Sequence, residues 1–318
     1  MEQRAFFAAS RLLIVAGKGG VGKTTVTAAM VRAAASTGLR VLAVAVDPGT
    51  NLGTLLGASE ALQDRDLVVA TGLGPRGNGS ITTRAIGAGT ALADYLEDHG
   101  LTRLVGRLLR NGVLDVVATA APGIDDLLVL GKVKQLERSG GFDLIVLDAP
   151  AAGHAITFLQ AASGLADVVK VGPIAAQASD VLAMLSDEAR CRVVLVTLAE
   201  ETPVNELVEV AFALEDRIGV ALGPVVVNAL EPDRAALDAV PTTVDGWETV
   251  SDADAKALVA AAAFRRARAA GQAEQVARLS SSLPLPQIAL GFRFVAGLDA
   301  SDVEALAGEL ADAIGALP

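Results

Sequence analysis

Cysteine is almost absent from this chain of 318 residues, which contains only Cys191. One cysteine cannot form a disulfide within the chain, and it cannot supply the thiolates of a cysteine metal cluster or an iron–sulfur cluster. Aromatic residues are also few, at 3%, although hydrophobic residues make up 52% of the sequence. The core must therefore be built mainly from Ala, Val and Leu, which suit a parallel sheet covered by helices.

The sequence also lacks an excess of positive charge and any long apolar run. Its formal net charge is −11, which argues against a protein that binds nucleic acid or anionic lipid mainly by electrostatic attraction. Charged residues, Gly or Pro interrupt each apolar stretch well before the roughly 20 residues that a membrane-spanning helix needs. The segment before the first apolar run is too short for a secretory signal. We therefore expect a cytoplasmic protein.

Short apolar runs alternate with helical patterns along most of the chain. The first helical pattern covers residues 23–36. Such alternation predicts a doubly wound α/β fold, with a mostly parallel sheet and helices on both of its faces. We expect a single domain over residues 1–318, with a helical insertion at about 88–138. A flexible loop is expected at 72–79, and a polar loop followed by an Ala-rich helix at 231–280. The expected strands are residues 11–16, 40–46, 80–86, 142–148, 166–171, 192–197, 223–228 and 284–289.

The first expected strand runs into Gly17-x-x-x-x-Gly22-Lys23-Thr24, which has the spacing of a P-loop. The glycines let backbone N–H groups surround a phosphate, and the following helix presents its positive N-terminus to the anion. In this arrangement Lys23 reaches the β- and γ-phosphates of ATP, and the Thr24 hydroxyl binds Mg²⁺. A plain glycine turn is the alternative, but the pattern lies between a strand and a helix, as a nucleotide site requires. The expected nucleotide-binding residues of this loop are Gly19, Gly20, Val21, Gly22, Lys23, Thr24 and Thr25.

Two aspartates lie at the ends of expected strands. Asp47 follows the strand at 40–46, and Asp148 ends the strand at 142–148. A carboxylate at the C-terminal end of a strand lies on the ligand side of a doubly wound sheet. Three apolar residues before Asp148 complete a Walker B pattern, whose aspartate holds Mg²⁺, often through water. Either aspartate alone could be a helix N-cap, but together with the P-loop they are interpreted as site residues.

These motifs resemble those of the arsenite-pump and tail-anchored-protein-targeting ATPases, the ArsA/GET family, which carries a deviant Walker A P-loop. The resemblance covers nearly the whole chain and is most specific at residues 17–25, 47–52 and 148–154. In this match, Asp47 of switch I polarises the attacking water. The match also places Gly153 and His154 in switch II.

The resemblance extends to the base of the nucleotide and to a lysine of the loop. It implies that Asn228 contacts adenine and that a late strand, matched by Pro284, Leu285 and Pro286, closes over it. It also implies that Lys18, a second lysine in the P-loop, reaches the nucleotide of a partner subunit and acts in catalysis with Asp47 and Lys23. The partner would be an identical chain or a paralogue. A solvated loop lysine is the alternative for Lys18.

The chain departs from this family at several positions. Gly49 and Thr50 stand where switch I usually has Ala-His. The thiolates that bind As(III) and the Cys-x-x-Cys zinc clasp are absent, so we expect neither arsenite nor zinc as a ligand. With three methionines in all, the Met-rich client groove is also absent. We expect a short bacterial form that acts on an unidentified client, in which the insertion either packs on the sheet or exposes a smaller groove.

Two other functions compete with a dimer that opens and closes with the nucleotide. A positioning ATPase would bind DNA or a membrane, but Arg265, Arg266 and Arg268 are more readily interpreted as a solvated helix face. Residues 301–318 carry acidic side chains and no Lys or Arg, unlike a membrane-targeting tail. A non-catalytic nucleotide-binding scaffold is the second alternative. The residues that disfavour it are Lys18, Lys23, Thr24, Asp47 and Asp148.

Overall fold

The computed structural model describes residues 1–46, 49–98, 100, 123–150, 154–232 and 246–317. Its centre is a nine-stranded sheet with the order β3-β4-β2-β5-β1-β6-β8-β9, in which β7 pairs with β6. Every strand pair is parallel except β3–β4. The strands are β1 (Leu12–Gly17), β2 (Arg40–Ala45), β3 (Leu67–Leu73), β4 (Gly79–Ala85), β5 (Leu144–Asp148), β6 (Cys191–Leu198), β7 (Ala221–Leu222), β8 (Val225–Leu230) and β9 (Gln287–Gly291).

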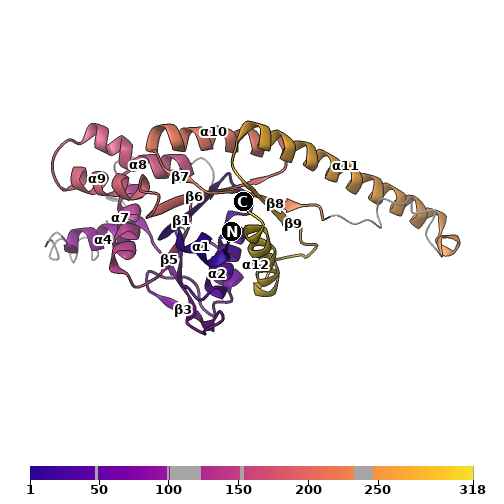
Figure 1. Ribbon diagram of the computed structural model, residues 1–318, viewed down its shortest axis with the longest axis horizontal. Coiled ribbons are helices and arrows are strands. Elements are labelled where there is room, and N and C mark those ends of the chain that lie inside the picture. Colours follow the sequence, from indigo (N-terminus) through magenta and orange to yellow (C-terminus); the bar gives the residue numbers. More distant parts are fainter. Residues whose placement is uncertain (47–48, 99, 101–122, 151–153, 233–245, 318) are drawn as a thin grey trace.

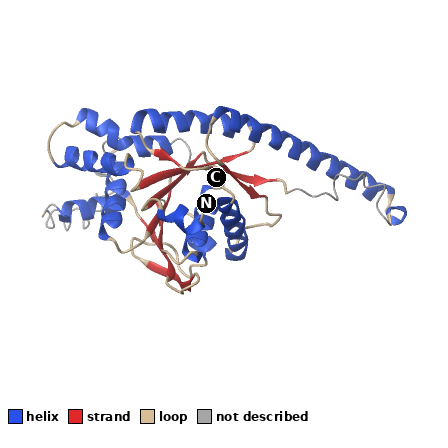
Figure 2. Cartoon of the chain, viewed as in Figure 1, coloured by secondary structure: helices blue, strands red, loops and turns tan. Residues whose placement is uncertain are grey.

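Helices cover both faces of this sheet (Figure 2). One face carries α1 (Gln3–Ala8), α2 (Lys23–Ser36), α3 (Leu52–Leu56) and α12 (Ala300–Gly315). The helices of the other face are α4 (Ala88–Asp98), α7 (Ile124–Ser139), α8 (His154–Val168), α9 (Pro173–Leu185), α10 (Glu201–Ile218) and the inner end of α11 (Asp252–Ser282), which a 3₁₀ turn at Trp247–Thr249 precedes. The doubly wound, mostly parallel architecture predicted from the sequence is confirmed.

Two hydrophobic cores lie on the two sides of the sheet. The side chains of each central strand point alternately into one core and into the other. In β1, Leu12 and Ile14 point into the core under α7 to α10, whereas Leu13 and Val15 point into the core under α2 and α12. All six residues of β1 are buried. A strand buried on both faces reads as a continuous apolar run rather than an alternating one, which is why this run stands out in the sequence.

Helix α11 is the longest of the described elements, with 31 residues (Figure 1). Its N-cap is Ser251, whose hydroxyl oxygen accepts a hydrogen bond from the Asp254 amide at 3.2 Å. Leu279 near its end is fully buried, but Leu258 and Phe264 are 50% and 67% exposed. The inner end is therefore anchored in the core, and the outer part extends from the body. No described helix combines the length and apolar composition needed to cross a bilayer.

Three expectations about the elements differ from the structure. Residues 166–171 were expected to form a strand, but residues 166–168 end α8, and Val168 and Val171 are at least 80% exposed. Strand β3 was not expected, because it is a half-exposed edge strand paired with β4 through the glycine-rich turn. Strand β9 begins at Gln287, after the prolines that were expected to start it. Within the insertion expected at 88–138, α4 and α7 are helical, and residues 101–122 lie outside the described part.

Candidate nucleotide-binding site

The C-terminal ends of the central strands bring the predicted site residues to one edge of the sheet. Asp148 at the end of β5 lies between Val15 of β1 and Ala45 of β2 in the strand register. Gly17, the last residue of β1, is paired with Val196 of β6. Asn228 of β8 pairs in turn with Leu198 of β6. The crevice outside these strand ends is where doubly wound sheets bind ligands.

Glycine is required at two positions of the P-loop because the backbone approaches its neighbours closely. A Cβ atom on Gly17 would lie 2.3 Å from the Val196 carbonyl oxygen. A Cβ atom on Gly22 would lie 2.2 Å from the Asn228 side-chain nitrogen, and the φ of Gly22 is +86°. This left-handed residue turns the chain directly into α2, so the N-terminus of α2 opens onto the loop.

Lys23 begins α2 and is turned inward, with 8% of the residue exposed. Its ammonium donates a hydrogen bond of 3.1 Å to the Lys18 carbonyl oxygen within the loop. Burial lowers the pKa of Lys23, and the nearby charge of Asp148 opposes that shift. Lys23 thus presents a partly desolvated cation to the loop, where it attracts an anion more strongly than it would in water.

Asp148 is 7% exposed and accepts two hydrogen bonds from α2. The Thr24 hydroxyl donates to Oδ2 at 2.7 Å, and the Thr27 hydroxyl donates to Oδ1 at 3.2 Å. Burial raises the pKa of Asp148, and the two hydroxyl donors and the charge of Lys23 oppose that shift. A buried carboxylate beside a hydroxyl forms a hard oxygen donor pair, which is the kind that Mg²⁺ prefers.

Lys18 points away from its own phosphate loop. Its side chain is 44% exposed, and its ammonium forms an ion pair with the carboxylate of Glu206 on α10. The two lysines of the loop therefore lie in different surroundings. Lys23 is directed into the site, and Lys18 is directed to the surface beside α10.

The predicted base-binding residues do not lie together. The Asn228 side chain donates a hydrogen bond of 2.9 Å to the Val21 carbonyl oxygen and so contacts the P-loop. Pro284, Leu285 and Pro286 precede β9, and the Pro286 carbonyl accepts a hydrogen bond from the Val225 amide at the start of β8. Because β8 and β9 are parallel, these three residues lie at the opposite edge of the sheet from the P-loop. The expectation that they close over the base is corrected accordingly.

The remaining predicted residues are only partly within the described chain. Asp47 and Gly153 lie outside the described residues, and His154 is described only as the first residue of α8. Gly19 and Gly20 are exposed in the loop, and Thr25 is half-buried in the first turn of α2. Two of the arginines considered for DNA binding, Arg265 and Arg268, instead lie 2.6 and 3.6 Å from the carboxylate of Glu231.

Two residues that contact this site were not predicted. Thr27 follows Thr24 by three residues, and that spacing on one helix face could have indicated a second hydroxyl near Asp148. Glu206 is one of several acidic residues of α10, and nothing in its sequence context distinguishes it from Glu201 or Glu209.

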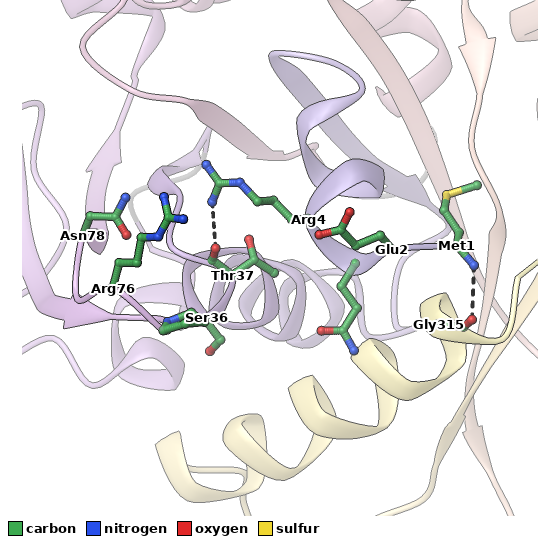
Figure 3. A pocket seen from close by; sticks show the side chains of 10 residues that line it. Met1, Glu2, Arg4, Ser36, Thr37, Arg76, Asn78 and Gly315 are labelled. Carbon is green, nitrogen blue, oxygen red and sulfur yellow. Dashed lines mark hydrogen bonds between the residues drawn. The ribbon is translucent and has the colours of Figure 1, made fainter.

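A separate cavity of about 720 Å³ lies at the far end of α2 (Figure 3). It lies between α1, the end of α2, the β3–β4 turn and the end of α12. Arg4 at its edge donates a hydrogen bond of 2.7 Å to the Thr37 carbonyl oxygen. The 14 residues of α2 separate this cavity from the P-loop, so the two are distinct.

Comparisons with known proteins find several ATPases that are similar to this chain. The family model described as anion-transporting ATPase matches residues 10–184. ATPase BagA of Mycobacterium tuberculosis is 33% identical over 240 residues, which are 71% of this chain and 68% of that protein. A Halobacterium salinarum protein whose name is that of an arsenical pump-driving ATPase is 26% identical over 70% of this chain and 36% of its own. ATPase GET3 of Ajellomyces dermatitidis is 29% identical over 47% of this chain and 42% of its own.

Proposed function

Since this chain belongs to the family of anion-transporting ATPases and is an ATP hydrolase, we propose that it hydrolyses ATP with Mg²⁺ and works as a nucleotide-driven dimer. In this proposal the hydrolysis is slow in the absence of a partner protein. Opening and closing of the dimer acts on a client that remains to be identified. The contact between Thr24 and Asp148 carries the proposal, because it joins the P-loop helix to the Walker B strand end.

The phosphates of ATP are proposed to lie against the P-loop. The backbone amides of Gly19, Gly20, Val21 and Gly22 and the N-terminus of α2 supply hydrogen-bond donors and positive potential. Lys23 is already desolvated beside this position, so its charge needs little rearrangement to meet the β- and γ-phosphates. Catalysis of phosphoryl transfer consists largely of such positioning and charge stabilisation.

The oxygen donors of this site fit a magnesium ion. The Thr24 hydroxyl would be a ligand, and the Asp148 carboxylate would hold the ion, directly or through water. The ion would offset the charge that develops on the phosphates during transfer. Its binding would also compensate the buried charge of Asp148, which in the described contacts is met only by two hydroxyl donors and the charge of Lys23.

The adenine base is proposed to lie between Asn228 and the segment that follows β9. The Phe292 amide donates a hydrogen bond of 2.7 Å to the Leu230 carbonyl oxygen, so this segment lies beside the end of β8. Phe292 and Phe294 contact each other edge to face, with ring centroids 4.7 Å apart. Pro284, Leu285 and Pro286 lie at the opposite end of β9 and cannot reach this position.

Asp47 is proposed to orient and polarise the attacking water. It follows β2, whose last residue, Ala45, is the register neighbour of Asp148. Replacing Asp47 with Asn should leave ATP binding within a few fold of wild type but nearly abolish turnover, because an amide polarises water poorly. Phosphate release and binding of a fluorescent ATP analogue, each with Mg²⁺ and with a chelator, measure the two properties.

A matched control is Asp64→Asn, which makes the same change at an exposed residue before β3. This control should hydrolyse ATP at the wild-type rate. If Asp47→Asn also does so, the role assigned to Asp47 is wrong. If the wild-type protein binds ATP and never releases phosphate under any tested condition, the proposed switch fails as a whole.

A further inference from the structure

Glu206 of α10 forms an ion pair with Lys18, the exposed lysine of the P-loop. We propose that Glu206 is a positioning residue for Lys18. It holds the Lys18 ammonium beside α10 and releases it to the nucleotide of a second copy when the dimer closes. The inference rests on the proposed function, in which Lys18 acts across the dimer.

The backbone and the side chain of Lys18 make contacts in different directions. Its backbone carbonyl accepts the Lys23 ammonium inside the loop, while its side chain leaves the loop toward α10. The ion pair therefore separates the tasks of two lysines that lie five residues apart.

Glu206 is held in place by its helix. Val204 and Leu207 on either side of it are 1% and 4% exposed, so this part of α10 is packed on the core. Arg278 of α11 contacts Asn205 and donates a hydrogen bond of 3.0 Å to the Glu201 carbonyl oxygen. A carboxylate on such a fixed turn sets the position of its flexible partner rather than following it.

Among the described residues, Lys18 is the hydrogen-bond donor to the Glu206 carboxylate. One oxygen receives the lysine, and the other is buried with no hydrogen-bond partner among the described residues. If Lys18 departs, this carboxylate has no hydrogen-bond donor among the described residues, so the ion pair persists until a stronger anion attracts Lys18. A carboxylate with Lys18 as its one described donor suits a contact that breaks only when a nucleotide is present.

The strengths of the two contacts allow Lys18 to exchange Glu206 for a phosphate of the partner's nucleotide. A half-exposed ion pair shifts an equilibrium by about fivefold at most. A charge-assisted hydrogen bond to a phosphate in a closed, dry interface contributes about tenfold or more. The Lys18 ammonium therefore leaves Glu206 when the partner subunit holds a nucleotide. It stays with Glu206 when the partner's nucleotide site is empty.

The first test measures the ion pair without using ATPase activity. N-hydroxysulfosuccinimide acetate acylates lysine amines, and mass spectrometry follows each of the six lysines in the chain. In nucleotide-free protein, Glu206→Gln should make Lys18 react about two- to fivefold faster relative to Lys256, an exposed lysine on α11. Glu209→Gln, the same change one turn further along α10, should leave the ratio as in wild type.

The second test measures release of Lys18 to a partner. Turnover per subunit is recorded against protein concentration, and the concentration that gives half-maximal turnover is compared. Glu206→Gln should lower it about two- to fivefold, because closure no longer breaks an ion pair. Glu209→Gln should not change it.

The outcomes separate this inference from the function on which it rests. If Glu206→Gln changes neither Lys18 labelling nor the half-maximal concentration, the role of Glu206 is wrong. A higher half-maximal concentration, or lost turnover at saturating protein, would mean that Glu206 stabilises the dimer itself and would also overturn it. Normal turnover in Lys18→Ala would instead remove the action across the dimer, whatever the labelling of Lys18.

Discussion

At the scale of single residues, one carboxylate connects the two halves of the candidate site. Asp148 lies on the sheet, and the hydroxyls of Thr24 and Thr27 approach it from the helix that carries the P-loop. A buried carboxylate that accepts hydrogen bonds fixes the helix to the strand end. In the proposed function it also sets the place where a cation would meet the phosphates.

Asp148→Asn should raise the Mg²⁺ concentration that gives half-maximal hydrolysis by about 10- to 100-fold, as loss of outer-sphere ligands does in other metal sites. The amide keeps the shape of the side chain and removes its charge. The measurement is the hydrolysis rate against free Mg²⁺. Asp143→Asn is the control, since Asp143 precedes the same strand and pairs with Arg40 at the other edge of the sheet. An unchanged Mg²⁺ requirement in Asp148→Asn would contradict the metal assignment.

Cys191 is fully buried at the start of β6, and burial raises the pKa of its thiol well above the usual range. Arsenite and zinc bind thiolates, so this residue is a poor ligand for either. We therefore expect arsenite to leave the hydrolysis rate unchanged and metal analysis to find no stoichiometric zinc. Stimulation by arsenite that disappears in Cys191→Ser would show that the thiol does act as a ligand.

At the scale of elements, α12 supports the P-loop helix from the far side. Its residues Val303, Leu306 and Leu310 are buried in the same core as α2. A capping box fixes its start, in which the Asp299 carboxylate accepts hydrogen bonds from the amides of Ser301 and Asp302. The acidic segment at the end of the chain is thus an integral helix of the fold.

Asp299→Ala should lower the melting temperature by about one to two degrees at pH 7. Hydrogen bonds from the Ser301 hydroxyl and from the amides of Asp302 and Ser301 lower the pKa of Asp299. Because the folded pKa is below the unfolded value of about 3.9, the carboxylate stabilises the fold fully above that pH. The contribution is lost as the pH falls through the folded pKa.

Melting curves of Asp299→Ala and wild type between pH 7 and pH 3 check this expectation, since the difference between them should narrow in acid. Asp312→Ala, at an exposed position in the last turn of α12, serves as the control and should show little change. A difference that stays constant across this pH range would mean that the carboxylate charge has no part in the cap.

Sequence patterns predict some elements well and others poorly, for physical reasons. Strands β1 and β5 are buried on both faces, so they appear as unbroken apolar runs. The edge strand β3 is half-exposed and has no such run, and the apolar end of α8 could not be told from a short strand by composition.

The same contrast holds for the candidate site. Thr24 and Asp148 follow from motifs whose ends the parallel sheet brings to one edge. The segment of Pro284 and Pro286 was assigned by resemblance, which did not specify the edge of the sheet. Glu206 could not be predicted at all, because its importance comes only from a contact with a residue 188 positions away in sequence.

At the scale of the whole molecule, the proposed reaction is shared between two subunits. In this proposal each active site takes Asp47 and Lys23 from one chain and Lys18 from the other. A cation delivered from across the interface offsets the charge of the transferring phosphoryl group only when the dimer is closed. Hydrolysis and closure are then one event.

Mixing two inactive variants tests this sharing. Lys18→Ala and Asp47→Asn should each lose turnover, while Lys18→Ala keeps its affinity for nucleotide within a few fold. A mixture should recover partial activity, because one site of the mixed dimer has an intact Asp47 and the partner's intact Lys18. Turnover is measured across mixing ratios at constant total protein. An active protein that stays monomeric with ATP would contradict the proposal.

The length of α11 has a mechanical consequence. Arg278, close to its inner end, is tied to α10, the helix that carries Glu206. A helix of 31 residues is about 46 Å long. A tilt of about 10° at this end therefore sweeps the tip through roughly 8 Å. The helix is a lever, so a distance probe at its tip would magnify small rearrangements of α10.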